Sequence, residues 1–234
     1  MSTWISLPKL PEQFPLSTDS VLLADFTTIT EKSRIFDLGA GPGTLGLLLC
    51  AKKSGCHADG IELQTASAEA AQSVIQLNNM EDRVSVTQGD LREIRAHFPA
   101  NRYDVVVSNP PYFPVNSGFT AQSEAMAIAR TELHCTLPDL CQAAAYLLRY
   151  GGIFTMVHRP ERLCDIMTAM RACKLEPKQL RLVCPKPDAA PALILIESKL
   201  GGKPGLTIRP NLILHQADGT PTEEYNRIYG LGGI

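Results

Sequence analysis

Short runs of apolar residues alternate with stretches of helical periodicity from residue 34 onward. The runs are rich in β-branched residues, which is typical of buried strands, and the stretches between them are long enough for helices. The expected strands cover residues 34–38, 58–62, 83–88, 103–108, 152–157, 180–184 and 192–198. The expected helices cover 44–54, 65–79, 91–97, 136–149 and 160–173. This alternation predicts repeated strand–helix–strand units, and therefore an α/β fold with a parallel sheet.

The last two expected strands are joined only by residues 185–191, which is too short for a crossover helix. They should therefore pair as an antiparallel hairpin. We expect a seven-stranded, doubly wound sheet that is mostly parallel, with an antiparallel last strand and helices on both faces. Thr136, with Asp139 three residues on, reads as a helix cap. The connection 109–135 is far longer than most strand-to-helix loops, which suggests a functional lid.

Composition and charge narrow the class of protein. The chain has 234 residues, 44% of them apolar, which suits one large α/β domain or two small ones. A net charge of −2 and a pI near 6.2 exclude a global positive field, so RNA binding would need a local patch. Seven cysteines without a CxxC pair indicate reduced thiols and no zinc site. With no leader and no long apolar run, we expect a cytoplasmic protein that uses neither membrane nor metal.

A glycine-rich turn, FDLGAGPGTLG, follows the first expected strand and opens the first helix of the alternation. Glycines there allow positive φ and let a ligand approach the backbone, next to unpaired N–H groups of the helix start. Gly41, Gly43 and Gly46 satisfy a dinucleotide fingerprint, with Glu62 further on. A tight turn without any ligand is a further alternative. The layout also resembles that of S-adenosylmethionine-dependent methyltransferases, which implies cofactor contacts from Asp37, Gly39, Ala40, Gly41, Gly43, Glu62 and Leu63.

The residues that end the third expected strand distinguish a dinucleotide from S-adenosylmethionine as the ligand of the glycine turn. In QGDLREI, Asp90 stands where methyltransferases of this layout usually hold the adenine amino group, and Leu91 would pack on the adenine ring. The alternative is that Asp90 only caps the helix that follows.

The fourth expected strand runs into SNPPY, which matches the [NDS]PP[YF] signature of enzymes that methylate planar nitrogens. The lone pair of such a nitrogen is delocalised, which makes the nitrogen a poor nucleophile. The site must therefore favour a tetrahedral geometry at the nitrogen. The Asn109 side-chain oxygen and the Pro110 carbonyl can accept its two hydrogens, while Pro111 stiffens the turn and Tyr112 stacks on the planar substrate. Asn109 is also expected at the cofactor. A rigid turn at a strand end is the alternative.

Seven stretches together resemble the bacterial tRNA1(Val) adenine-37 N6-methyltransferases, in the branch found in Gram-positive bacteria: PLSTDSVLLADF, DLGAGPGTLGLLL, GIELQ, NPPYF, ARTELHCTLPDL, VHRPERLCDI and EEYNRIYG. The resemblance implies methyl transfer from S-adenosylmethionine to N6 of an adenine beside a tRNA anticodon, by a class I methyltransferase with a Rossmann-like fold. It further implies that Thr18 and Asp19 belong to an element that closes over the cofactor. The domains expected are a closing segment 1–33, a methyltransferase domain 34–198 and a packed C-terminal extension 199–234.

RNA contacts would come from a basic segment, 149–186, which has a local excess of five positive charges. The candidates for phosphate or base contacts are His158, Arg159 and Arg162, with Arg130 in the long connection. A solvated helix surface explains the same charges equally well.

Three other functions remain open. A protein glutamine N5-methyltransferase would use the same tetrapeptide on a side-chain amide, but those enzymes carry a sizeable helical N-terminal domain. An rRNA guanine-N2 methyltransferase shares the tetrapeptide and commonly has a duplicated domain. A nucleotide-binding protein without turnover would keep only the fold. The sequence leaves protein partners undetermined.

Overall fold

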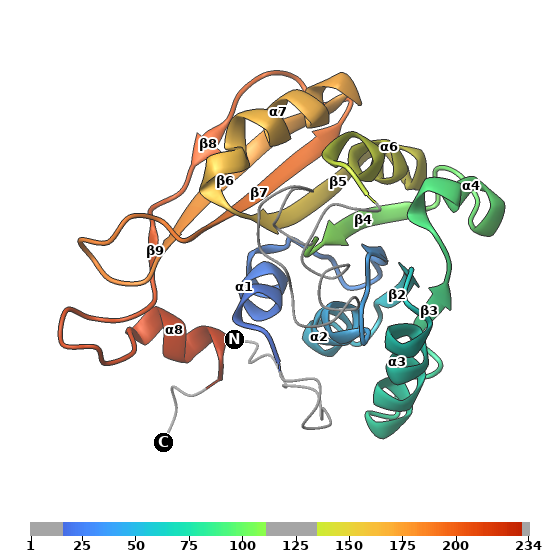
Figure 1. Ribbon diagram of the computed structural model, residues 1–234, viewed down its shortest axis with the longest axis horizontal. Coiled ribbons are helices and arrows are strands. Elements are labelled where there is room, and N and C mark those ends of the chain that lie inside the picture. The colour runs from blue at the N-terminus through green and yellow to red at the C-terminus, as the bar shows by residue number, and fades with distance from the viewer. Residues whose placement is uncertain (1–15, 111–134, 231–234) are drawn as a thin grey trace, which may run out of the picture.

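The computed structural model describes residues 16–110 and 135–230, which build one twisted sheet between two layers of helices (Figure 1). Its strands are β1 (Arg34–Leu38), β2 (His57–Glu62), β3 (Val84–Gln88), β4 (Tyr103–Ser108), β5 (Leu148–His158), β6 (Leu175–Cys184), β7 (Leu193–Leu200), β8 (Thr207–Ile208) and β9 (Leu212–Ile213). The described helices are α1 (Thr18–Phe26), α2 (Thr44–Lys52), α3 (Thr65–Leu77), α4 (Ile94–His97), α6 (Leu137–Leu147), α7 (Leu163–Ala172) and α8 (Glu223–Ile228). Two 3₁₀ turns, η1 (Leu91–Glu93) and η2 (Pro160–Arg162), precede α4 and α7.

The strand order is β3-β2-β1-β4-β5-β7-β6-β8, and β9 also pairs with β6. Strands β1 to β5 pair in parallel, whereas β7 runs antiparallel to both β5 and β6. The expected α/β fold, with a mostly parallel sheet, helices on both faces and an antiparallel hairpin of β6 and β7, is therefore confirmed. Strand β6 begins five residues earlier than the expected 180–184. The sequence did not reveal its first half because that half lacks a continuous apolar run.

Within residues 16–110 and 135–230 the sheet has nine strands, where seven were expected. The additional strands, β8 and β9, are two residues long each and extend the β6 edge from the C-terminal extension. A strand of two residues has no period, so the apolar pattern could not reveal it.

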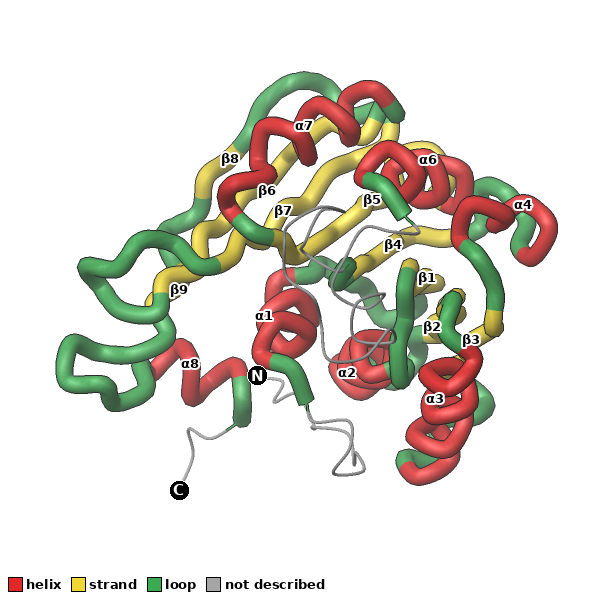
Figure 2. The backbone as a smooth tube through the Cα atoms, viewed as in Figure 1, coloured by secondary structure: helices red, strands yellow, loops and turns green. Residues whose placement is uncertain are grey.

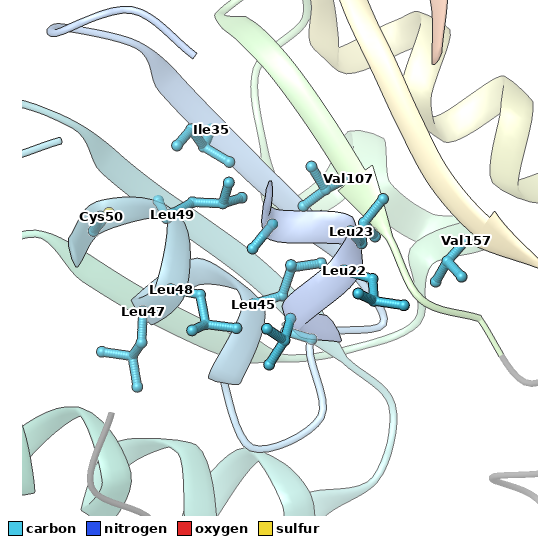
Figure 3. Packing of buried hydrophobic residues seen from close by; sticks show 14 of the residues in the cluster. Leu22, Leu23, Ile35, Leu45, Leu47, Leu48, Leu49, Cys50, Val107 and Val157 are labelled. Carbon is cyan, nitrogen blue, oxygen red and sulfur yellow. The ribbon is translucent and has the colours of Figure 1, made fainter. Parts of the chain in front are cut away.

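The two faces of the sheet bury separate cores, because successive strand residues point to opposite sides. Ile35, Val105 and Val107 pack with α1, α2 and α3, as Figure 2 shows for the layers. Phe36 and Val106, one residue away, pack instead with α4, α6 and α7. Figure 3 shows the first core, where leucines of α1 and α2 meet β4 and β5. Helix α1 was not expected from the sequence, since VLLA in its middle is apolar all round.

The direction of the connections reverses between β1 and β4, which lie side by side in the sheet. In open α/β sheets, the crevice outside the carboxyl ends of two such strands is where ligands bind. The glycine turn leaves the end of β1 and Asn109 follows the end of β4. No helix in the parts described, 16–110 and 135–230, combines the length and apolarity that a bilayer crossing requires.

Candidate active site

The glycine turn folds back tightly from β1 toward α2. Gly39, Gly41 and Gly43 have φ of +74°, +52° and +75°, as the spacing predicted. The N–H groups of Gly39 and Ala40 both donate to the Ile61 carbonyl of β2, at 3.0 Å each. Helix α2 begins directly after Gly43, so its first N–H groups face the crevice.

Gly60 lets this turn lie against β2, a role that the sequence analysis missed. A Cβ atom at residue 60 would stand 2.8 Å from the Ala40 Cβ and 3.3 Å from the Asp37 carbonyl oxygen. The signal available in the sequence was a glycine inside a strand, which often marks a close backbone approach.

Glu62, at the end of β2, is held by two backbone donors. Its Oε2 accepts from the Gly41 N–H at 2.8 Å and its Oε1 from the Gln64 N–H at 2.9 Å, and the residue is 8% exposed. A carboxylate oxygen has two lone pairs, so each oxygen can accept one more hydrogen bond. The carboxylate therefore locks the turn and can still receive two hydroxyl groups of a ligand.

A cavity of about 300 Å³ lies between the glycine turn, the start of α1 and the end of β4. Its lining residues are Ser17, Ser20, Asp37, Gly39, Ala40, Gly41, Pro42, Thr44, Leu45 and Asn109. Asp37 is 3% exposed, and its Oδ2 has no hydrogen-bond partner in the described part of the protein. Burial, reinforced by the nearby Glu62, raises the pKa of Asp37 to about 7. A buried carboxyl oxygen that lacks a partner on a cavity wall fits a ligand with an ammonium group, such as the amino-acid end of S-adenosylmethionine.

Asn109 is fixed beside the glycine turn through the last residue of β4. The buried Ser108 hydroxyl donates to the Leu38 carbonyl of β1 at 2.7 Å, which ties the two strand ends together. The Asn109 amide Nδ2 donates to the Ser20 hydroxyl of α1 at 3.2 Å. Pro110 lines a second, smaller cavity of about 50 Å³, whose other lining residues are Leu38, Gly39, Leu91, Ser108, Cys135, Thr136, Leu137, Leu140 and His158.

The structure brings most of the expected cofactor residues to one edge of the sheet. Leu63, just beyond Glu62, is 36% exposed and can cover a flat ring. Asp90 is engaged by Arg92, since its carboxylate caps η1 through the Arg92 N–H at 2.9 Å and also pairs with the guanidinium. Asp90 thus caps the turn that follows it, which was the alternative role for this residue. The contact of the Asp90 carboxylate with an adenine stays a prediction. Thr18 begins α1 beside Tyr229 of the C-terminal extension and is not among the cavity-lining residues.

The expected RNA contacts divide into different environments. His158 is fully buried, and burial together with Arg162 lowers its pKa to about 4, so its ring is neutral at pH 7. A neutral, buried ring does not fit the phosphate contact considered for His158, but it does border the smaller cavity beside Pro110. Arg162 pairs with Asp165 at 2.8 Å, and Arg159 lies 3.9 Å from Glu161. Pro111, Tyr112 and Arg130 lie outside the described residues.

The basic segment 149–186 does not form one surface. Arg149 is the second residue of β5 and Arg159 follows its end, so the two residues are roughly 30 Å apart along the strand. Other cations of the segment are used within the protein, in the ion pairs Arg149–Asp104, Arg171–Glu176 and Arg181–Glu224. The number of positive charges that an RNA could contact at the crevice is therefore smaller than the sequence of this segment suggests.

Comparisons with known proteins agree on one kind of enzyme. The model of the methyltransferase small domain family matches residues 17–172. A tRNA1(Val) (adenine(37)-N6)-methyltransferase of Tolumonas auensis is 30% identical over 219 residues, which are 90% of this chain and 86% of that protein. A protein of the same name from Yersinia pseudotuberculosis is 31% identical over 143 residues, covering 61% of this chain and 56% of the relative, little more than half its length.

Among solved structures, a predicted O-methyltransferase from Agrobacterium tumefaciens superposes with a TM-score of 0.76. Its sequence is 22% identical, and the match covers 91% of this chain and 96% of that one. At this identity the likeness is one of fold.

Proposed function

Because this chain belongs to the methyltransferase small domain family, we propose that it is an enzyme that methylates N6 of an adenine in tRNA, with S-adenosylmethionine as the methyl donor. The position is adenine 37 of tRNA1(Val), as in the names of its relatives. The observation that carries the proposal is the shared cavity, whose wall joins the glycine turn to Asn109. A methyl donor held by the turn would lie beside the residue that receives the amine.

The cofactor is held by side chains and backbone groups already fixed by the fold. Asp37 receives the ammonium group, the turn at Gly39 and Gly41 admits the chain close to its backbone, and Glu62 receives the ribose hydroxyls. Leu63 and Leu91 cover the adenine ring, beside Asp90. When bound, S-adenosylmethionine supplies a methyl group on a positively charged sulfur.

Asn109 and Pro110 act on the substrate amine. The Asn109 side-chain oxygen and the Pro110 carbonyl accept its two hydrogens, which directs the lone pair toward the donor. Support comes from the hydrogen bond of Ser108 to Leu38, which fixes the start of this tetrapeptide before substrate arrives. Pro111 stiffens the carbonyl and Tyr112 stacks on the base. The methylated nitrogen is cationic and loses its proton readily, so the site needs no strong base.

Several narrower assignments complete the proposal. Residues 1–33 close over the cofactor, 34–198 perform the chemistry and 199–234 pack on that domain. Arg130, Arg159 and Arg162 contact RNA, and His158 borders the substrate base. The protein works in the cytoplasm and belongs to the branch of the family found in Gram-positive bacteria.

The test is methyl transfer to tRNA taken from cells that lack this protein, read by mass spectrometry of nucleosides. The wild type should produce N6-methyladenosine. Asn109→Ala should lower turnover on the order of 100-fold with almost unchanged affinity for S-adenosylmethionine, the scale of losing a transition-state contact. Asn211→Ala, at an exposed position, is the matched control. Wild-type turnover in Asn109→Ala, or a product other than N6-methyladenosine, would contradict the proposal.

A further inference from the structure

We propose that Ser20 of α1 is a positioning residue for the reaction, because it supplies the acceptor that the Asn109 amide needs in its reactive orientation. The inference rests on the proposed function, since it concerns how Asn109 receives the substrate amine. It starts from one long-range contact, in which Asn109 Nδ2 donates to Ser20 Oγ at 3.2 Å across 89 residues of sequence.

The chemistry of the amide makes this contact matter. A primary amide has an oxygen end that accepts and a nitrogen end that only donates. A substrate NH₂ group offers hydrogens, so the Asn109 oxygen has to face it and the Asn109 nitrogen has to face away. In that orientation the nitrogen is best held by an acceptor of its own, since Asn109 is half-buried and a donor partly withdrawn from water loses stabilisation without a partner. The Ser20 hydroxyl, on a residue 8% exposed, is an acceptor within reach.

Ser20 is well placed because the first turn of α1 is capped. The Ser17 hydroxyl accepts from the Ser20 N–H at 3.2 Å and donates to the Ser20 hydroxyl at 2.9 Å. Ser17, Ser20 and Asn109 all line the cavity of about 300 Å³. The acceptor therefore stands on the wall of the proposed cofactor cavity, on a helix rather than on a loop.

The other end of α1 is anchored just as firmly. The Lys52 ammonium of α2 donates to the carbonyls of Ala24, Asp25 and Thr27, at 3.0, 3.1 and 3.0 Å. These are carbonyls at the C-terminal end of α1, where a positive charge is also favourable. Between the two ends, residues 21–24 are buried in the core, as Figure 3 shows for Leu22 and Leu23. Packing thus sets the position of Ser20, so its hydroxyl is already in place before the reaction begins.

The deciding experiment compares Ser20→Ala with Ser20→Thr in the tRNA methylation assay. Loss of the hydroxyl should lower kcat about 3- to 10-fold, the scale of losing one part-buried hydrogen bond, with the dissociation constant for S-adenosylmethionine unchanged. Ser20→Thr retains the hydroxyl and should recover most of kcat. Thr27→Val is the structural control, because it removes the hydroxyl of the C-cap residue of α1, which donates to the Leu23 carbonyl at 2.7 Å and does not line the cavity. It should lower the unfolding temperature without changing kcat.

A double-mutant cycle shows whether Ser20 acts through Asn109. Ser20→Ala should have no further effect on kcat in the Asn109→Ala background, because the amide is already gone. An equal additional loss there would overturn the inference, as would full kcat in Ser20→Ala, or a loss of cofactor affinity alone. If the wild type transfers no methyl group, the proposed function fails. If the wild type is active and only the Ser20 variants depart from expectation, the role of Ser20 fails and the proposed function stands.

Discussion

Replacing Asp37 by asparagine should make the stability of this protein less dependent on pH. Asp37 is 3% exposed, its Oδ2 has no partner in the residues described, and its pKa is raised from 3.8 to about 7. Burial is the main cause and the charge of Glu62 adds to it. An asparagine of nearly the same shape removes the titration and leaves the cavity wall in place.

The sign follows from proton counting. Between pH 3.8 and about 7 the folded protein keeps the Asp37 proton, which the unfolded chain releases, so rising pH favours unfolding over this range. Each unit of pKa difference corresponds to about 1.4 kcal/mol, so the wild type should lose about 3 kcal/mol relative to Asp37→Asn between pH 5 and pH 8. At pH 5 the variant is not expected to be the more stable protein, because its amide must also be accommodated without a partner.

The assay is urea unfolding at pH 5, 6, 7 and 8, followed by circular dichroism without cofactor. The quantity of interest is the difference in free energy of unfolding between variant and wild type at each pH, since other groups, such as His158, titrate in both proteins. Asp188→Asn, at an exposed position, gives the effect of the same replacement on the surface. A difference that stays constant from pH 5 to pH 8 would refute the reasoning, because Asp37 would then be ionised throughout.

Three further changes test the surroundings of the site. Lys52→Met should cost about 2–4 kcal/mol in urea unfolding, because three carbonyls at the end of α1 lose a charged donor; an unchanged midpoint would contradict this. Gly60→Ala should cost about 1–3 kcal/mol and weaken S-adenosylmethionine binding in calorimetry, because a Cβ there collides with the glycine turn; wild-type affinity would show that the turn does not hold the cofactor. Charge reversal at Arg159 and Arg162 should weaken tRNA binding and flatten its salt dependence, whereas reversal at Arg171, which pairs with Glu176, should not; equal effects would indicate a non-specific charge response.

Local patterns in the sequence were enough to predict the class of fold and the residues at the centre of the candidate site. Apolar runs of strand length, separated by helical periodicity, can satisfy their burial only in a sheet covered on both faces, and that sheet is what forms. The short link 185–191 fixed the antiparallel hairpin for the same local reason. The glycines at 39, 41 and 43 allowed the positive φ that the tight turn adopts. Such features depend on neighbours in sequence, so a single sequence contains them.

Tertiary structure decided which distant groups meet. Nothing near Ser20 in the sequence says that its hydroxyl accepts from Asn109, and nothing near Glu62 says that it binds the Gly41 N–H. The basic segment showed the reverse, since residues close in sequence are carried by β5 to opposite ends of the sheet. Hydrogen bonds and ion pairs depend on distances of a few ångströms, and those distances are fixed only when strand order and helix packing bring separate segments together.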